Sequence, residues 1–244
     1  MKMSSLSQKM GARRFKTMGK NFIANVSHEL RTPITVIRGF AEMLQNGALL
    51  SPQTTLEITD KIVHTCDRLD KLVKALLRLA DIEPLSQDRF CACHLMSLME
   101  HCKHLLLTAY PSVQFDIVGE KEDVFVLGDF DLLDIAVMNL LENAVKYSSS
   151  PAQIRASVRV ENGLVHIGFQ DRGIGVPGVD LPHIFDRFYT VDKGRSRKSG
   201  GAGLGLSIVK TIIEKHQGTV GVESELGKGS VFTIGLPVIT NKES

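Results

Sequence analysis

Two apolar runs with heptad spacing occupy the first third of the chain and constrain its fold more than any other feature. In the first run, mostly apolar side chains recur at alternating steps of three and four: Ile23, Val26, Leu30, Pro33, Ile37, Phe40 and Leu44. The second run repeats this spacing: Ile62, Thr65, Leu69, Leu72, Leu76 and Leu79. The polar, glycine-containing stretch Asn46–Gln53 separates them. The pattern predicts two long amphipathic helices that form an antiparallel hairpin.

A single hairpin of this kind leaves part of each apolar stripe exposed to water. Two copies that pack together bury both stripes in a four-helix bundle. We therefore expect the chain to be a homodimer whose hairpins form that bundle.

The pattern changes after Pro84, where a helix is expected to stop. Helix periodicity recurs at His94–Leu107, Asp131–Tyr147 and Leu204–His216. Strand-like runs lie between and after these segments: Val113–Val118, Val124–Leu127, Ile154–Val160, Val165–Gln170, Thr219–Glu223 and Val231–Leu236. This order predicts an α/β sandwich with helices on one face of a mixed sheet. We expect a basic tail at 1–13, the hairpin at 14–84 and the α/β domain at 85–244.

Composition excludes several classes of protein. The chain is 43% hydrophobic and 23% charged, as globular proteins are, and its net charge of +2 gives no reason to expect a nucleic-acid partner. It contains neither an apolar run of about 18 residues nor an apolar signal segment. Its four irregularly spaced cysteines fit a reducing compartment, so we expect a cytoplasmic location. The first 28 residues carry six cations and no acid, which suits a solvated tail or a segment beside a membrane.

His28 occupies a heptad f position on the first predicted helix, pointing away from the apolar seam. Such a residue is usually an ordinary surface histidine. Here Glu29 follows directly, and Thr32 lies one turn further along the same face. An exposed imidazole is largely neutral near pH 7, and a carboxylate that holds one ring N–H leaves the other nitrogen free to attack. The pattern indicates a nucleophile, and Pro33 permits a helix bend just beyond it.

The predicted helix Asp131–Tyr147 carries a polar stripe opposite its apolar face. Asn139 and Asn143 are four residues apart, and Lys146 follows three residues later. Two amide oxygens and a cation on one face suit a complex of Mg²⁺ with a triphosphate. An ordinary solvated helix face is the alternative interpretation.

Two glycine-containing segments favour the ligand-binding interpretation. Asp171 ends a predicted strand, and Gly173 and Gly175 after it permit a tight turn and close approach to a ligand. The run Gly200–Leu206 enters a helix, where backbone N–H groups and the positive helix end can face phosphate. Its spacing, and the lack of a strand before it, argue against a dinucleotide-binding fingerprint.

Five segments in this order resemble the sequence boxes of sensor histidine kinases of bacterial two-component systems, in the subclass with an H-E-x-x-T pattern. They are Asn25–Pro33 (H-box), Asn139–Tyr147 (N-box), Asp171–Gly175 (G1 box), Ile184–Tyr189 (F-box) and Gly200–Leu206 (G2 box). The resemblance covers about residues 14–238. It implies a histidine-bearing hairpin followed by an ATP-binding domain.

The resemblance also implies roles for individual residues. In the hairpin, His28 would accept the phosphoryl group, Glu29 would act as general base, and Thr32 would orient water during dephosphorylation of the partner. In the second domain, Asn143 would hold Mg²⁺, Lys146 would approach phosphate, Asp171 would accept the adenine amino group and Arg187 would meet the γ-phosphate. The remaining expected nucleotide-binding residues are Asn139, Tyr147, Gly173, Gly175, Gly201, Gly203, Leu204 and Gly205.

The implied activity is autophosphorylation of His28 from Mg·ATP and transfer of the phosphoryl group to an aspartate in the receiver domain of a response regulator. The signal would come from a membrane or from a separate sensory partner. Two alternatives remain: an ATP hydrolase of the gyrase or mismatch-repair type, and a non-catalytic scaffold. The hydrolases carry a glutamate one turn before the metal-binding Asn, where this chain has Asn139. A scaffold would be expected to lack a catalytic box.

Two further segments carry separate expectations. Six potential metal ligands fall within 14 residues: Cys91, Cys93, His94, His101, Cys102 and His104. Their spacing matches no common zinc pattern, and an ordinary helix stripe accounts for the region. The basic, glycine-rich segment Gly194–Gly203 is expected to close as a lid over a bound nucleotide.

Overall fold

The computed structural model describes residues 2–47, 51–119, 123–192 and 202–239. The chain divides into two compact units, Met1–Lys74 and Ala75–Ser244, which we call the helical unit and the α/β unit. The segment expected to act as a lid falls largely at 193–201, outside the described residues. No helix in the described part of the chain is long and apolar enough to cross a membrane.

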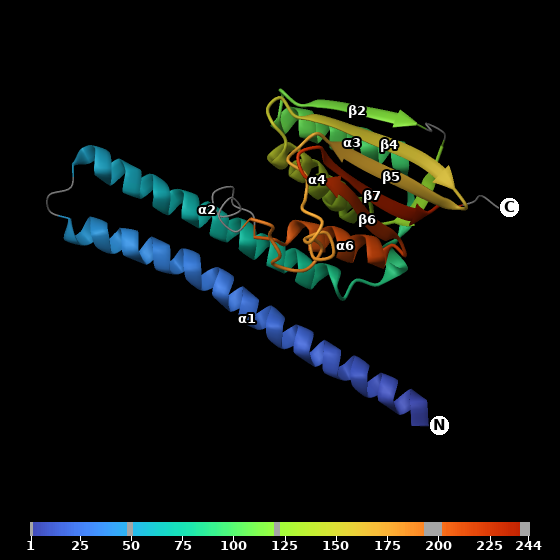
Figure 1. Cartoon of the computed structure of the whole chain (residues 1–244), viewed down its shortest axis with the longest axis horizontal. Coiled ribbons are helices and arrows are strands. Elements are labelled where there is room, and N and C mark those ends of the chain that lie inside the picture. Colours follow the sequence, from blue (N-terminus) through green and yellow to red (C-terminus); the bar gives the residue numbers. More distant parts are fainter. Residues whose placement is uncertain (1, 48–50, 120–122, 193–201, 240–244) are drawn as a thin grey trace. The chain divides into compact units, whose positions relative to one another are not determined.

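The helical unit contains α1 (Lys2–Asn46) and most of α2 (Pro52–Ile82). Figure 1 shows the two helices running side by side in opposite directions, as the heptad runs predicted. Ser51 caps α2, where its hydroxyl accepts a hydrogen bond from the Thr54 N–H at 3.1 Å. The first helix begins at Lys2 rather than near Arg14, so the residues expected to form a tail continue α1.

Burial in the hairpin follows the predicted seam. Pro33 and Leu72 of the seam are buried and most other seam positions are half-buried, while Ile58, one turn before the predicted second run, is buried as well. A second set of apolar side chains lies outside this seam and is exposed, including Leu56 and Val63, which are one heptad apart on α2. The hairpin therefore leaves apolar surface uncovered on its own.

The α/β unit contains the end of α2 and the elements that follow it: η1 (Gln87–Arg89), β1 (Cys91–His94), α3 (Leu95–Ala109), β2 (Gln114–Gly119), β3 (Phe125–Gly128), α4 (Phe130–Tyr147), β4 (Gln153–Glu161), β5 (Leu164–Asp171), α6 (Gly205–Lys215), β6 (Thr219–Glu225) and β7 (Gly229–Pro237). Every strand and helix expected after Pro84 is present. The short strand β1, which pairs with β3 in a two-stranded sheet, was not expected.

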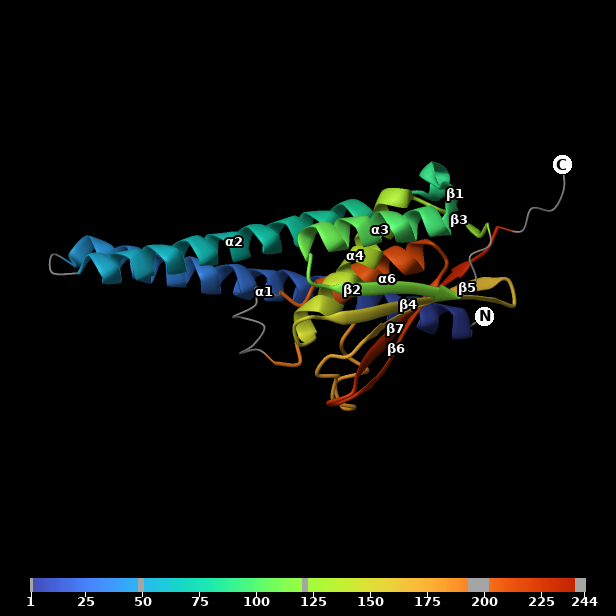
Figure 2. The same ribbon diagram turned by 90° about the horizontal axis from the view of Figure 1, so that it is seen from above.

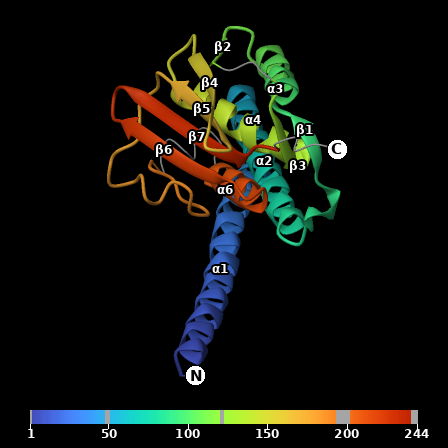
Figure 3. The same cartoon turned by 90° about the vertical axis from the view of Figure 1, so that its right-hand side faces the viewer.

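The main sheet has five strands in the order β2-β4-β5-β7-β6 (Figure 3). β2 pairs in parallel with β4 and the other pairs are antiparallel, which confirms the mixed sheet. Helices α3, α4 and α6 lie together on one side of it (Figure 2). The alternating apolar residues of β4 and β5, such as Ile154, Ala156 and Ile167, are buried under these helices. The predicted two-layer sandwich is therefore confirmed.

His216 joins two of the helices in this core. It is buried at the end of α6, where Nε2 accepts a hydrogen bond from the Asp129 N–H at 3.0 Å and Nδ1 lies 2.7 Å from the Ile212 carbonyl oxygen. The Phe90 ring stacks on the imidazole at 4.4 Å between centroids. These partners require a neutral ring with its proton on Nδ1. Burial lowers the pKa of His216, although the Ile212 hydrogen bond and the Asp129 charge oppose the shift.

We predict that the α/β unit loses stability as pH falls below about 6.5, the ordinary histidine value, because the unfolded chain then binds a proton that folded His216 resists. The urea midpoint of the full chain, followed by circular dichroism, should fall between pH 7.5 and 5.5, and His216→Gln should reduce this dependence. His104→Gln, which alters an exposed histidine on α3, is the matched control. An unchanged pH dependence in His216→Gln would contradict the assignment.

Candidate functional site

The His28 side chain is exposed on α1, as its heptad position predicted, and Thr32 lies one turn further on. The Thr32 hydroxyl donates to the His28 carbonyl oxygen at 3.1 Å. Pro33 is buried, and α1 continues through it without a break. The expected nucleophile is therefore accessible on a regular helix.

Glu29 does not face His28 in this structure. Adjacent helical residues point in different directions, and the Glu29 carboxylate lies 3.8 Å from the Arg68 guanidinium of α2. Both side chains are partly exposed, so this ion pair is weak. The pairing of Glu29 with the His28 ring that the sequence suggested is absent among the described contacts of the hairpin.

Helix α4 presents the expected polar stripe, but Asn139 contacts other parts of the protein. The Asn139 side chain donates to the Ile135 carbonyl oxygen at 2.7 Å, and its own oxygen is turned toward Gly205 at the start of α6. A side chain at Gly205 would lie 2.9 Å from that oxygen, so α6 approaches α4 closely only because glycine stands there. Asn139 thus fixes the distance between the two helices. Its bound amide is poorly placed to be a metal ligand.

Asn143 and Lys146 are half-buried further along α4. Within the described residues, the Asn143 amide makes no hydrogen bond, which leaves its oxygen available to a ligand. The Lys146 ammonium lies over the Tyr147 ring, 5.0 Å from its centroid. These residues can offer a metal-binding oxygen, a cation and an aromatic face to one nucleotide.

Asp171 is held at the end of β5, close to the end of α4. Its carboxylate oxygen Oδ1 accepts hydrogen bonds from the Gly173 N–H at 2.7 Å and the Ser230 N–H at 3.3 Å. The side chain is only 5% exposed. Burial raises the pKa of Asp171, and the two backbone hydrogen bonds oppose that shift. A buried carboxylate held in this way is suited to accept a hydrogen bond from a ligand amino group.

The loop that contains the G1 box (Asp171–Gly175), called the G1 loop below, contacts the end of α4 at Tyr147 and Ser148. The Ile174 N–H donates to the Tyr147 carbonyl oxygen at 3.1 Å, and Gly173 forms a β-bridge with Ser148. The Ser148 hydroxyl is buried and is without a hydrogen-bond partner in the described structure. A buried polar atom of this kind normally has a partner, so its presence beside the G1 loop favours a bound water or ligand there.

Arg187 is placed beside the first turn of α6 by the backbone that follows it. The Phe188 N–H donates to the Gly203 carbonyl oxygen at 2.8 Å, and Leu204 then precedes α6. Phe188 has φ of +66°, a left-handed conformation that is strained for a bulky residue and typical of functional segments. Gly203, with φ of +69°, packs against this turn, where a side chain would collide with Phe188 and Tyr189. Arg187 therefore lies next to the helix end expected to face phosphate.

The structure thus brings most of the expected nucleotide-binding residues of the α/β unit into one connected region. Asn139 touches Gly205, Tyr147 touches the G1 loop that contains Gly173 and Gly175, and Arg187 adjoins Gly203 and Leu204. Gly201 lies outside the described residues. His28, Glu29 and Thr32 belong to the helical unit, where Thr32 contacts the His28 backbone and Glu29 pairs with Arg68.

Sequence reasoning assigned no site role to Ser148 or Ser230. Ser148 directly follows the N-box, and Ser230 is the second residue of β7, beside the glycines at 227 and 229, so their positions near recognisable segments were the available signal. Their importance depends on contacts between distant segments, which a local pattern does not contain.

A hollow of about 320 Å³ at the ends of β5, β6 and β7 overlaps this region only at Asp171 and Ser230. It is lined by Gln170, Asp171, Glu223, Ser224, Glu225, Lys228, Gly229, Ser230 and Val231. Its three acidic side chains, Asp171, Glu223 and Glu225, against the single cation Lys228 make it unsuited to a triphosphate.

The two buried cysteines between residues 91 and 104 each bond to a protein partner in the α/β unit. The Cys93 thiol donates to the Gly128 carbonyl oxygen at 3.2 Å, and the Cys102 thiol donates to Asp134 at 3.2 Å. Burial, with the neighbouring Cys91, raises the pKa of Cys93 to about 11, which disfavours the thiolate that a metal needs. No group of three or more His, Cys, Asp or Glu side chains in the described part of the chain could hold a metal ion.

Comparisons with known proteins match both units. The family model of the His Kinase A (phospho-acceptor) domain matches residues 20–85, and that of the histidine kinase-, DNA gyrase B- and HSP90-like ATPases matches residues 128–240. The sensor-like histidine kinase SenX3 of Mycolicibacterium smegmatis is 34% identical over 95% of this chain and 60% of its own length. The sensor histidine kinase WalK of Bacillus subtilis is 34% identical over 92% of this chain and 37% of its own length.

A solved structure shows the same fold. The histidine kinase ThkA, crystallised in complex with the response regulator protein TrrA, gives a TM-score of 0.75 over 98% of this chain and 67% of that chain, at 22% identity. This chain belongs to the sensor histidine kinase family, with the phospho-acceptor domain followed by the ATPase domain. It spans less than two thirds of the length of the two curated relatives described above.

We predict that Asp171→Asn stabilises the protein without nucleotide at neutral pH while weakening nucleotide binding roughly ten- to hundredfold. The raised pKa means that the folded state holds its proton more tightly than the unfolded state, so ionisation of Asp171 costs stability as pH rises. The asparagine oxygen can still accept from Gly173 and Ser230. Urea unfolding and calorimetric titration with ADP measure the two effects. A lower urea midpoint for Asp171→Asn at pH 7.5 would contradict this account.

Proposed function

We propose that this chain transfers the γ-phosphoryl group of ATP to His28 and then to an aspartate in the receiver domain of a response regulator. The observation that carries the proposal is that one chain combines an exposed histidine in an H-E-x-x-T helix with the region around Asn143, Asp171 and Arg187. Membership of the sensor histidine kinase family supports it.

In the proposed first step, a ring nitrogen of His28 attacks the γ-phosphorus. The new P–N bond forms as the bond to the departing ADP oxygen breaks, and the ring N–H proton passes to Glu29. Glu29 must then turn away from Arg68, which their weak, partly exposed ion pair permits. Positioning and charge supply most of the rate enhancement in such transfers, because little covalent chemistry falls to the protein.

The nucleotide would bind along α4 and the first turn of α6. Asp171 would accept from the adenine amino group, Tyr147 would cover the base, and Lys146 and Arg187 would face the phosphates. The free N–H groups after Leu204 would contribute further phosphate contacts. The half-buried Asn143 oxygen fits Mg²⁺, which binds few protein oxygens and takes its other ligands from phosphates and water. The ion would neutralise charge on the phosphates.

Transfer is better supported than hydrolysis. A hydrolase needs a base near the γ-phosphate, but the Asn139 amide cannot accept a proton and already donates to Ile135. Glu142 is exposed on another side of α4. Burial, and to a smaller extent the Glu142 charge, raise the pKa of Tyr110 at the end of α3. The Glu142 carboxylate therefore lies on the side of α4 that is near Tyr110.

The remaining parts of the proposal concern partners and location. Two hairpins would pair through their exposed apolar stripes, and Thr32 would orient water when the phosphorylated regulator is dephosphorylated. We place the activity in the cytoplasm, with the signal supplied by a membrane or a separate sensory partner. The domain boundaries would be 14–84 for the hairpin and 85–244 for the ATP-binding domain.

We predict that His28→Gln abolishes the label that the protein acquires from γ-³²P-ATP, because no other side chain accepts the phosphoryl group. ADP binding should remain unchanged, since the nucleotide region is separate. His64→Gln, which alters another exposed histidine of the hairpin, should be labelled normally. The label should be acid-labile, and its persistence in His28→Gln would disprove the assignment. Free phosphate without labelled protein would favour hydrolysis.

We further predict that Val63→Glu shifts the dimer to monomer, because Val63 is 51% exposed on the hairpin and a charge there cannot be buried at low cost. Sedimentation velocity measures the change. His64→Glu adds the same charge at an exposed position one residue away and should leave the dimer intact. Equal sedimentation of wild type and Val63→Glu as dimers would exclude this stripe from the interface.

A further inference from the structure

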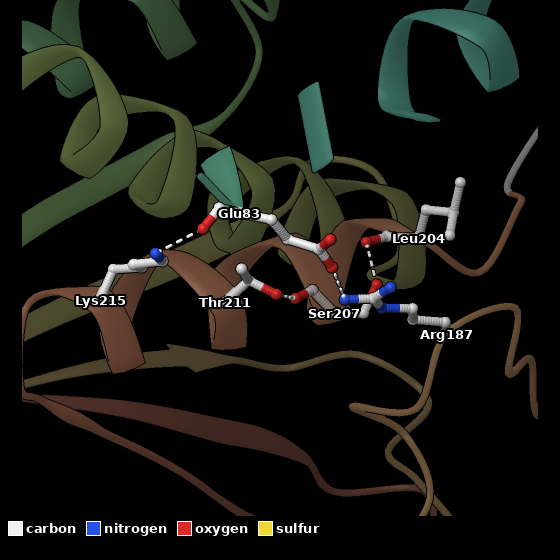
Figure 4. A network of polar contacts seen from close by, with 6 residues as sticks. All are labelled: Glu83, Arg187, Leu204, Ser207, Thr211 and Lys215. Atoms are coloured by element: carbon white, nitrogen blue, oxygen red, sulfur yellow. Dashed lines mark hydrogen bonds and ion pairs between the residues drawn. The ribbon is translucent and has the colours of Figure 1, made fainter. Parts of the chain in front are cut away.

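The chain that leaves α2 lies along α6, and an ion pair closes this contact. Figure 4 shows Glu83 between two cations, Arg187 near the first turn of α6 and Lys215 at its last turn. The Arg187 guanidinium donates to Glu83 Oε1 at 2.5 Å. All of these residues belong to the α/β unit.

Glu83 is held in place independently of this ion pair. Its N–H donates to the Leu79 carbonyl oxygen at 3.1 Å, and the Lys215 ammonium donates to its carbonyl oxygen at 2.6 Å and to that of Leu85 at 3.2 Å. Leu79 and Ile82 are 1% and 2% exposed, so they anchor the end of α2 in the core. The Glu83 carboxylate is therefore presented to Arg187 by a fixed backbone.

Arg187 is the cation that the proposed function assigns to the γ-phosphate. The Glu83 carboxylate takes up part of the guanidinium surface that a phosphate would use, since both groups bind its N–H donors in the same way. A carboxylate at that position also repels an incoming triphosphate. Glu83 and a γ-phosphate are thus expected to compete for Arg187, whereas ADP has no group that takes part in this competition.

We propose that Glu83 is a positioning residue that holds Arg187 in a resting arrangement and weakens the preference of the site for ATP over ADP. This proposal rests on the proposed function. Binding of the triphosphate draws Arg187 away from Glu83, and loss of the γ-phosphate lets the ion pair form again. The ion pair is suited to this exchange because Arg187 and Glu83 are 33% and 53% exposed, so it is only weakly stabilising.

The test compares the dissociation constants of ADP and a non-hydrolysable ATP analogue, both with Mg²⁺, for the full chain. Glu83→Gln should tighten binding of the analogue about two- to fivefold, the size expected for a partly exposed ion pair, and leave ADP binding unchanged. Asp81→Asn removes the same charge from an exposed neighbour on α2 and should change neither constant. In an Arg187→Gln background, Glu83→Gln should have no effect on the ratio of the two constants.

Three results would overturn the proposal. Weaker analogue binding by Glu83→Gln would mean that Glu83 orients Arg187 toward phosphate. Equal changes for both nucleotides would indicate a purely structural role, and no change in either dissociation constant would show that Glu83 does not restrain Arg187. If Glu83→Gln unfolds, Glu83→Asp replaces it in the test. This variant keeps the charge but shortens the side chain, so it should also raise the preference for the analogue over ADP. Failure of the wild type to bind either nucleotide would instead refute the proposed function.

Discussion

The nucleotide-binding region depends on the packing of α4, which contacts the sheet on one side and α3 and α6 on others. Its apolar residues, among them Leu133, Leu140 and Leu141, are buried in these contacts. Asn143 and Lys146 then have only the remaining side of the helix available to them. Because the buried face fixes the rotation of α4 about its own axis, the same packing that stabilises the domain also aims the polar residues.

Much of this arrangement follows from local sequence. The helix expected at Asp131–Tyr147 is observed at Phe130–Tyr147, because strong periodicity coincides with a capping residue: the Asp129 carboxylate accepts from the Leu132 N–H at 3.2 Å. Strand β1 was missed because four residues carry no usable period and its pairing with β3 brings together segments more than thirty residues apart. Local pattern thus predicts elements better than it predicts pairings between distant ones.

The site shows a similar limit at the level of side chains. The position of Asn139 on α4 was predicted correctly, but its contact with Gly205 depends on how α6 approaches α4. Neighbours in sequence were also poor guides to neighbours in space, since Glu29 faces Arg68 of another helix instead of the adjacent His28. Motif spacing predicts which residues meet a ligand, whereas the contacts of those residues with the rest of the protein have to be found in the structure.

Several features of the α/β unit are unfavourable to folding and make sense only in relation to a ligand. Asp171 is a buried carboxylate, Ser148 presents a buried hydroxyl without a described partner, and Phe188 adopts a strained backbone conformation. All three adjoin residues of the recognised boxes, while the surrounding core is apolar and well buried. The fold therefore tolerates local cost where a bound nucleotide would relieve it. The weak ion pair between Glu83 and Arg187 fits this scheme, because a contact that substrate must displace has to be weaker than the contact that replaces it.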